Sequence, residues 1–266
     1  MVTAEREVSV IIPFYNEEEN VNDTLRAVSQ SLAKSGFRSW ELVLVNDGST
    51  DSTRTLLEEW VTQDPNATVV NHRRNLGVGA ALRSGIVHAR GKTLVTIEGD
   101  LTYDPEDIMR LIDEINAGYD IVIGSHYARA GCVSGVPTLR YLISRIGNLL
   151  LARSIGLKEV SCVTNSFRAY RSNVRHLFAT AHYEDKRLHP SILLLANLSK
   201  FRIKEIPVFL GSRKRGKSKT HVTRTAFSHA GLLFSIVCIR IRSAIAKETQ
   251  ASVFEASKHH ALDNLR

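Results

Sequence analysis

The feature that most constrains the fold of this chain is a regular alternation of short apolar runs and longer helical patterns in its first half. The apolar runs are rich in β-branched residues and have no polar face, which is typical of strands buried on both sides. They cover residues 8–14, 41–46, 67–71, 93–97 and 120–124. The helical patterns between them cover residues 17–35, 51–62, 77–89 and 105–117. Strand–helix alternation with short connections predicts an α/β fold with a doubly wound, mostly parallel sheet.

The second half of the chain is less regular, and we interpret it as two further helices and two further strands. The helical patterns are those of residues 138–157 and 188–198. The strand patterns are those of residues 163–170, a returning strand, and 201–209. The last strand is expected near a sheet edge, because Pro207 has no amide hydrogen for a ladder bond.

The composition is that of a globular protein, with 43% hydrophobic and 23% charged residues, which excludes a disordered or fibrous chain. A length of 266 residues suits one large domain. We expect a single domain over residues 1–222 and a C-terminal amphipathic helix with a polar tail over residues 223–266. The three cysteines are far apart and have neither metal-ligand spacing nor the pattern of a disulfide framework, which favours a reducing compartment.

Neither end of the chain has the pattern of a targeting or membrane-spanning segment. The N-terminus, MVTAEREVSV, lacks the apolar core of a signal peptide. The longest uncharged run near the C-terminus, residues 225–239, is shorter than the ~20 residues that cross a bilayer. We expect a cytoplasmic protein. The helix over residues 223–247 has two interpretations: it packs on protein, or it lies at the membrane surface with its arginines near lipid headgroups.

The positive charge is concentrated in one segment. The net charge is 35 − 27 = +8. Residues 202–224 carry eight Lys or Arg and one acid, which accounts for +7 of it. A basic run is often a solvated face or a nucleic-acid patch, whereas a functional segment of this kind binds phosphates or an anionic membrane. The segment RKRGKSK, residues 213–219, lacks the upstream glycines of a P-loop, so it is not one. We expect instead a basic loop that closes over a diphosphate.

An acidic triplet at the end of a predicted strand is the strongest chemical signal. In parallel sheets, ligands bind beyond the carboxyl ends of the strands. Glu98, Gly99 and Asp100 follow the fourth strand, and Thr102 stands two residues further on. Two carboxylates across a tight glycine, with a hydroxyl nearby, suit Mg²⁺ or Mn²⁺ shared with substrate phosphates. The alternative is an acidic turn that caps the next helix.

Two other strand ends carry polar groups suited to a nucleoside. Asp47 follows the second strand, where a carboxylate can accept hydrogen bonds from a base or a ribose. The segment Pro13 to Glu17 offers the ring of Tyr15 and a carboxylate beside the first strand end. Both segments also suit ordinary strand-to-helix connections with a helix cap.

The order of these motifs resembles that of a known family. The chain contains, in this order, PFYNEEEN, LVNDGSTDST, RNLGVGAALRSGIVHARG, LTYDPEDI, IGSHY, FRAYR, EIPV and R-x-x-GKSK. This pattern resembles the family-2, inverting GT-A glycosyltransferases. Within them it is similar to the dolichol- or polyprenyl-phosphate mannosyl- and glucosyltransferases. The resemblance covers residues 8–219, about four fifths of the chain.

The resemblance implies a role for each matching position. A nucleotide-sugar donor is expected at one set of residues, with Asp100 as the central catalytic position: Pro13, Tyr15, Glu17, Val45, Asp47, Glu98, Gly99, Asp100, Arg213 and Lys219. Mg²⁺ or Mn²⁺ is expected at Glu98, Asp100 and Thr102. The acceptor phosphate is expected at His126, Arg140 and Ser144. The implied function is sugar transfer from a nucleotide diphosphate sugar to a polyprenyl phosphate, by a membrane-associated enzyme.

Departures from the family pattern concern the acceptor more than the fold. Glu98 replaces the usual Asp, and Asn165-Ser166 replaces a usual Ser-Gly. His126 stands where the family has an Arg, which removes a permanent charge. With His126 in the site, acceptor affinity is expected to fall as the pH rises through about 6.5, the ordinary imidazole pKa.

Other functions stay open from the sequence. A soluble GT-A transferase acting on a small acceptor, such as a natural-product intermediate, is the first alternative. A hydroxyl acceptor would need a base, for which Glu184, Asp185 and His189 are candidates. A non-catalytic sugar-nucleotide sensor is the second alternative. A nucleic-acid binder is disfavoured, because the basic loop is short and has no interleaved aromatic residues.

Overall fold

The structure is a computed structural model that describes residues 6–129, 132–181, 183–213, 215 and 231. The chain divides into two units, residues 1–220 and 221–266, and only the first is described below. The expected helix over residues 223–247 lies outside the described residues, apart from Gly231. The domain boundary at residue 222 therefore stays a prediction.

The first unit is built on a seven-stranded sheet with the order β3-β2-β1-β4-β6-β5-β7. The strands are β1 (Arg6–Phe14), β2 (Trp40–Asn46), β3 (Ala67–Asn71), β4 (Gly91–Thr96), β5 (Ile121–Ser125), β6 (Arg168–Arg171) and β7 (Ile203–Pro207). β3, β2, β1 and β4 are mutually parallel, and β5 is parallel to β7. The predicted doubly wound, mostly parallel α/β sheet is confirmed, and β7 with Pro207 lies at the edge as expected.

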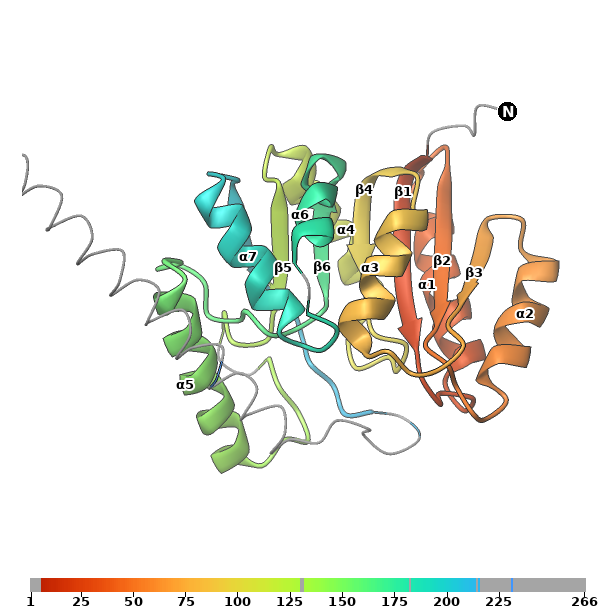
Figure 1. Cartoon of the computed structure of the whole chain (residues 1–266), viewed down its shortest axis with the longest axis horizontal. Coiled ribbons are helices and arrows are strands. Elements are labelled where there is room, and N and C mark those ends of the chain that lie inside the picture. Colours follow the sequence, from red (N-terminus) through yellow and green to blue (C-terminus); the bar gives the residue numbers. More distant parts are fainter. Residues whose placement is uncertain (1–5, 130–131, 182, 214, 216–230, 232–266) are drawn as a thin grey trace, which may run out of the picture. The chain divides into compact units, whose positions relative to one another are not determined.

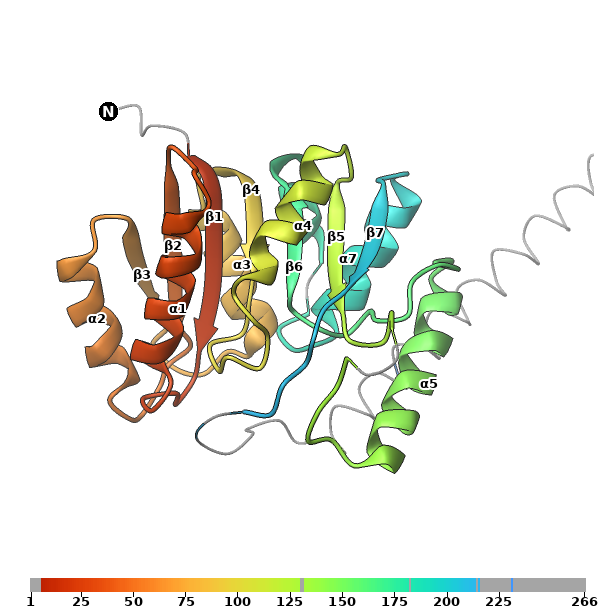
Figure 2. The ribbon, with the colours of Figure 1, turned by 180° about the vertical axis from the view of Figure 1, so that it is seen from behind.

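Helices cover both faces of this sheet, as Figures 1 and 2 show from opposite sides. They are α1 (Val21–Lys34), α2 (Thr53–Gln63), α3 (Val78–His88), α4 (Asp107–Asn116), α5 (Thr138–Ser154), α6 (Arg175–Thr180) and α7 (Leu188–Leu198). α1, α2 and α4 share one hydrophobic core with the sheet. α3, α6 and α7 lie on the opposite face (Figure 1). α5 lies apart from both layers, on the side to which the carboxyl ends of β1, β2 and β4 point (Figures 1 and 2).

The strand pattern explains why both faces are covered. In β1, Val10, Ile12 and Phe14 point into the core shared with α1, and Ile11 points to the other face. On that other face, a Cβ at Gly85 of α3 would lie 2.3 Å from Ile11, so only glycine allows the helix to approach so closely. β1 and β2 end together, since Phe14 pairs with Asn46. The residues after these strands, including Glu17 and Asp47, therefore lie at one edge of the sheet.

The second half differs from the sequence prediction in one important element. The returning strand was predicted over residues 163–170, but β6 covers only Arg168–Arg171 and runs antiparallel between β4 and β5. Residues 161–166 form a loop whose backbone donates to two polar side chains. Glu205 accepts from the backbone of Ser161 and Cys162, and Asn148 accepts from the backbone of Val163 and Thr164. These bonds replace a strand ladder, so the strand is shorter than its pattern.

Candidate active site

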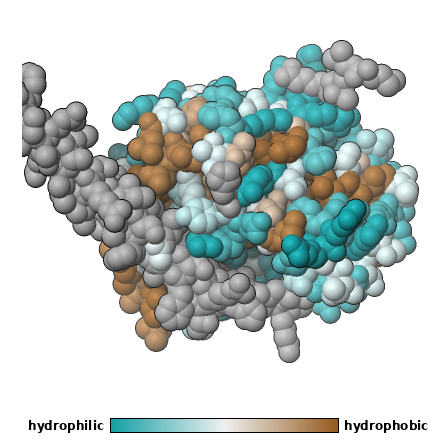
Figure 3. Space-filling view, in the orientation of Figure 1, coloured by the Kyte–Doolittle hydropathy of each residue, from teal (hydrophilic) through white to brown (hydrophobic). Residues whose placement is uncertain are grey.

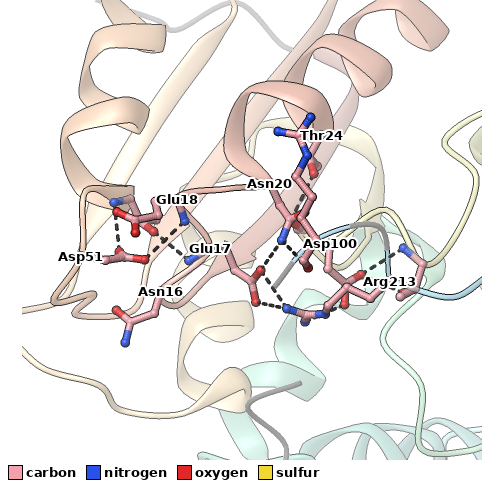
Figure 4. Close-up of polar contacts among 12 residues, drawn as sticks. Asn16, Glu17, Glu18, Asn20, Thr24, Asp51, Asp100 and Arg213 are labelled. Atoms are coloured by element: carbon pink, nitrogen blue, oxygen red, sulfur yellow. Dashed lines mark hydrogen bonds and ion pairs between the residues drawn. The ribbon is translucent and has the colours of Figure 1, made fainter. Parts of the chain in front are cut away.

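The centre of the site is an ion-pair cluster of two carboxylates and one guanidinium. Glu17 follows β1, Asp100 follows β4, and Arg213 follows β7. Nη1 of Arg213 lies 2.8 and 2.9 Å from the two carboxylate oxygens of Glu17, and Nη2 lies 2.8 Å from Oδ2 of Asp100. Figure 4 shows the guanidinium beside the two acids. The three side chains are only 10%, 8% and 19% exposed for Glu17, Asp100 and Arg213, so water weakens these ion pairs little.

Glu17 is held in this cluster from several directions. Its backbone N–H donates to the hydroxyl of Thr53 at 2.8 Å, and the side-chain amide of Asn20 donates to its carboxylate at 2.7 Å. Burial raises the pKa of Glu17, and the nearby Asp100 carboxylate raises it further, against the opposing effect of Arg213 and Asn20. Burial lowers the pKa of Arg213, but the two carboxylates outweigh this and raise it. The guanidinium therefore lies between two close carboxylates and offsets part of their mutual repulsion.

The acidic turn has a backbone that only certain residues tolerate. A Cβ at Gly99 would lie 2.5 Å from the ring of Phe14, so a side chain there would displace the core. Leu101 has a positive φ of 55°, which is strained for a non-glycine residue. Oδ1 of Asp100 accepts from the backbone N–H of Thr102 at 3.1 Å and from its hydroxyl at 2.8 Å. The turn thus fixes Asp100 with its second oxygen, Oδ2, facing Arg213.

Glu98, the first acid of the triplet, has a different partner. The hydroxyl of Ser166 donates to Oε1 of Glu98 at 2.7 Å. Ser166 comes from the loop before β6 and is itself fixed, because the hydroxyl of Thr96 donates to its carbonyl oxygen. Two departures from the family pattern, Glu98 and Ser166, are therefore in direct contact.

Asp47 organises the loop that follows β3. Its Oδ1 lies 2.7 Å from Nδ1 of His72 and accepts from the backbone N–H of Leu76 at 2.9 Å. Its Oδ2 accepts from the backbone N–H of Gly77 at 2.9 Å. Nε2 of His72 lies 2.9 Å from the hydroxyl of Ser84 on α3. Asp47 is 2% exposed, so the side chain expected to bind a nucleoside here anchors the wall of the site.

The three residues expected at the acceptor meet around Tyr127, beyond β5. The hydroxyl of Tyr127 donates to that of Ser144 on α5 at 2.7 Å, and its ring centroid lies 4.1 Å from that of His126. Burial raises the pKa of Tyr127 to about 12, and Arg140 on α5 acts in the opposite direction. The Arg140 side chain is exposed. Residues that follow β5 and residues of α5 thus lie together around the Tyr127 side chain.

His126 itself is buried rather than open to an anion. It is 8% exposed, and its Nδ1 lies 3.0 Å from the hydroxyl of Tyr103. Burial lowers the pKa of His126 to about 4. The imidazole is therefore neutral near pH 7, and the expected loss of acceptor affinity through pH 6.5 does not follow from this geometry.

The other residues predicted for the nucleoside, the diphosphate and a catalytic base make fewer contacts that bear on the site. Pro13 and Val45 are paired in register on β1 and β2. Val45 is fully buried, so its side chain belongs to the core. Tyr15 is half-buried, and Lys219 lies outside the described residues. Of the candidate bases, Asp185 pairs with Arg187 and His189 is 3% exposed at the start of α7.

Three further residues that shape the site were not assigned to it from the sequence. Ser166 donates a hydrogen bond to Glu98. The sequence feature that could have indicated this role is the serine at a position where the family usually has glycine. Glu205 accepts hydrogen bonds from the backbone of the loop over residues 161–166. The sequence feature that could have indicated this role is one acidic residue within a strand whose other residues are basic or apolar. His72 was recognisable only as one of several polar residues at strand ends.

The carboxylates of this site fit a divalent cation that the substrate also binds. Glu17 and Asp100 together hold a guanidinium, so the site is built for positive charge. Carboxylates are hard oxygen ligands that suit Mg²⁺ or Mn²⁺. Within the described residues, no group of three His, Cys, Asp or Glu side chains converges to hold a metal alone.

Solved structures with a similar fold are glycosyltransferases. Glucosyl-3-phosphoglycerate synthase from Mycobacterium tuberculosis, in complex with phosphoglyceric acid, matches with a TM-score of 0.65 and 19% identity over 87% of this chain and 80% of that chain. Its complex with Mn²⁺ and uridine-diphosphate-glucose matches with a TM-score of 0.63 and 21% identity over 87% and 79%. At this identity, the likeness shows the fold, which is that of the GT-A glycosyltransferases.

The sequence comparisons identify the family. The model of Glycosyl transferase family 2 matches residues 9–178, and the chain belongs to this family. Proteins named undecaprenyl-phosphate 4-deoxy-4-formamido-L-arabinose transferase, from Salmonella paratyphi B and Salmonella newport, are each 31% identical over 218 residues. The match covers 80% of this chain and 62% of each relative. The chain thus spans about three fifths of the length of these relatives.

Proposed function

We propose that this chain transfers a sugar, with inversion, from a nucleotide diphosphate sugar to a polyprenyl phosphate. The observation that carries the proposal is the 31% identity to transferases named for an undecaprenyl-phosphate acceptor. The match covers 80% of this chain. The chain that carries these candidate site residues belongs to Glycosyl transferase family 2. The fold supports a nucleotide-sugar donor, because the predicted donor residues follow neighbouring strand ends.

An outward apolar face on α5 supports a lipid-linked acceptor. Tyr141, Asn148, Leu151 and Ala152 are at least half-buried on one side of the helix. The opposite side exposes six large apolar residues: Leu139, Leu142, Ile143, Ile146, Leu149 and Leu150. With 3.6 residues per turn, these six share one face. Figure 3 shows apolar side chains over the lower left of the view, where α5 lies in Figure 1.

The charges on α5 favour an anionic bilayer as the surface that this face meets. The helix carries Arg140, Arg145 and Arg153 and no acidic residue. By helical position, Arg140 and Arg145 lie on opposite borders of the apolar face. An apolar face bordered by arginines is typical of helices that lie in the headgroup region of a membrane. We therefore propose peripheral attachment through α5, next to the expected acceptor residues. Among the described residues, no helix is long and apolar enough to cross a membrane.

The proposed roles follow the predicted positions. Pro13, Tyr15, Val45 and Asp47 line or support the nucleoside site. Glu98, Asp100 and Thr102 would hold Mg²⁺ or Mn²⁺, with Glu17 beside them. Arg213 and Lys219 would bind the diphosphate, and Arg140, Ser144 and His126 would form the acceptor side. Residues 1–222 are proposed as the catalytic domain and residues 223–266 as a C-terminal amphipathic helix and polar tail.

The chemistry needs positioning and charge more than a strong base. A phosphate acceptor is already anionic near neutral pH, so its oxygen can attack the anomeric carbon without a residue that removes a proton. The bound divalent ion would supply stabilisation of the negative charge on the leaving nucleoside diphosphate. Arg213 and Arg140 add cations on the donor and acceptor sides. They lessen the repulsion between the two anions that must meet.

Product analysis tests the proposal. The purified protein is offered a panel of nucleotide sugars with Mg²⁺ or Mn²⁺, and polyprenyl phosphate or water-soluble acceptors are supplied side by side. We expect one lipid-phosphate sugar product with inverted anomeric configuration. We also expect loss of turnover by orders of magnitude in excess chelator and in Asp100→Asn. Efficient transfer to a water-soluble acceptor alone would favour the soluble alternative.

A further inference from the structure

Arg213 occupies the position at Asp100 where a divalent cation is expected. Both oxygens of this carboxylate have partners, because Oδ1 accepts from Thr102 and Oδ2 accepts from Arg213. Arg213 is also a predicted diphosphate ligand, so one side chain connects two expected binding events. A cation that binds Oδ2 would therefore compete with the guanidinium for this oxygen.

Charge balance explains why one cation has to be present. Glu17 and Asp100 are each no more than 10% exposed as side chains, and both pair with the same guanidinium. Arg213 offsets the repulsion between these two buried carboxylates. A divalent ion at Asp100 would bring a second cation beside the Arg213 guanidinium, and the two cations would repel each other. A nucleoside diphosphate offers Arg213 a new anionic partner in its phosphates.

We propose that Arg213 and the divalent cation bind the Asp100 carboxylate alternately, so that the ion pair excludes free metal until a nucleoside diphosphate arrives. This inference rests on the proposed metal role of Asp100. It goes beyond that role, because it makes the binding of metal and nucleotide interdependent. Free metal competes at Asp100 with the charge-assisted hydrogen bond that Arg213 donates to Oδ2, whereas metal that arrives with a diphosphate brings Arg213 another anionic partner. Linkage then requires that each ligand tightens the binding of the other.

The test measures Mn²⁺ binding directly, by electron paramagnetic resonance of the free ion, without sugar donor or acceptor. For the unaltered chain, we expect weak Mn²⁺ binding that UDP tightens by about tenfold or more, within the usual range of such coupling. Arg213→Gln should bind Mn²⁺ alone at least about tenfold more tightly than the unaltered chain. UDP should then tighten it much less. Arg213→Lys keeps the charge and should stay close to the unaltered chain.

A matched control separates this effect from a general change of charge. Arg54→Gln removes the same charge on α2, from an exposed pair with Glu58 at 2.8 Å, and should leave Mn²⁺ affinity unchanged. Thermal unfolding of each variant shows whether it is folded. Unchanged or weaker Mn²⁺ binding in folded Arg213→Gln would overturn the inference, even if the protein forms the expected lipid product. Conversely, tighter Mn²⁺ binding in this variant would support the inference whichever acceptor is used.

Discussion

Glu98 and Ser166 each differ from the residue usual in the family, and the structure places them in hydrogen-bond contact at 2.7 Å. The longer side chain of Glu98 reaches a hydroxyl that a glycine at position 166 would not provide. A hydrogen bond to a charged group contributes about 1.5–3 kcal/mol. The two departures therefore compensate each other, and they should be energetically coupled.

A double-mutant cycle tests this coupling. We expect Ser166→Gly and Glu98→Asp each to lower kcat/KM by about tenfold, because each breaks the same contact. The double variant should lose less than the product of the two effects, with a coupling of about 1–2 kcal/mol. Ser199→Gly, at an exposed serine after α7, is the control and should have no effect. Fully additive losses would show that Ser166 does not position Glu98.

At this scale, the sequence predicted the participants of the site better than their contacts. Glu17, Asp100 and Arg213 were expected from the family pattern, but with three separate tasks. Their direct ion pairing depends on side-chain directions at the ends of three strands, which no local pattern encodes. The buried environment of His126 also depends on Tyr103, 23 residues away, so its lowered pKa was not predictable.

Among the elements, α5 has the most unusual surface for its place in the fold. The helix was predicted from its periodicity, but the apolar stripe of such a pattern normally faces a core. In α5 the side of the helix with Asn148 and Leu151 packs inward, and the side with the six large apolar residues is exposed. Periodicity reports which residues share a face, but it does not report what that face contacts.

If the exposed face of α5 binds a membrane, its replacement should separate binding from stability. Ile143→Gln together with Ile146→Gln removes apolar groups that are 63% and 49% exposed. We expect the free energy of unfolding to change by less than about 1 kcal/mol, since little buried area is lost. Binding to vesicles of anionic phospholipid should fall by about tenfold or more. The measurements are co-sedimentation with vesicles and urea denaturation.

A control variant and two outcomes complete this test. Leu198→Gln, at a residue 67% exposed on α7, removes an apolar side chain away from α5 and should not change vesicle binding. Unchanged binding of the double variant would contradict membrane attachment through α5. Strong destabilisation of the double variant would instead indicate that this face packs on protein.

For the whole molecule, a buried ion pair ties the sheet together at the end opposite the site. Glu41 on β2 is 1% exposed and accepts from the hydroxyl of Ser9 on β1 at 2.6 Å. It also accepts from the backbone and guanidinium of Arg90, just before β4, at 2.6–2.8 Å. Three neighbouring strands are therefore connected through one carboxylate.

Removal of this carboxylate should destabilise the fold strongly. Glu41→Ala leaves buried donors unpaired, and we expect a loss of about 3–5 kcal/mol in the free energy of unfolding. Glu58→Ala is the comparison, because Glu58 pairs with Arg54 on the surface, with side chains 44% and 61% exposed. That change should cost about 1 kcal/mol or less. Urea denaturation of both variants measures the difference, and similar losses would argue against a special role of Glu41.

The folded state as a whole should also lose stability in mild acid through His126. Burial lowers the pKa of this imidazole from 6.5 to about 4, so between these values the unfolded chain binds more protons than the folded chain. The contribution is therefore fully present above about pH 6.5 and is lost as the pH falls toward 4. Between pH 7.5 and pH 5 this loss amounts to about 2 kcal/mol for one such group.

His126→Gln isolates this contribution, because the glutamine carbonyl can still accept from the hydroxyl of Tyr103 but does not titrate. Urea denaturation of both proteins at pH 7.5 and pH 5 gives the pH-dependent loss for each. All other titrating groups contribute equally to both, so we expect the variant to lose about 2 kcal/mol less on acidification. Parallel losses would show that His126 is accessible to protons in the folded protein. In that case the imidazole could carry charge near neutral pH, and its expected contact with an acceptor phosphate would regain support.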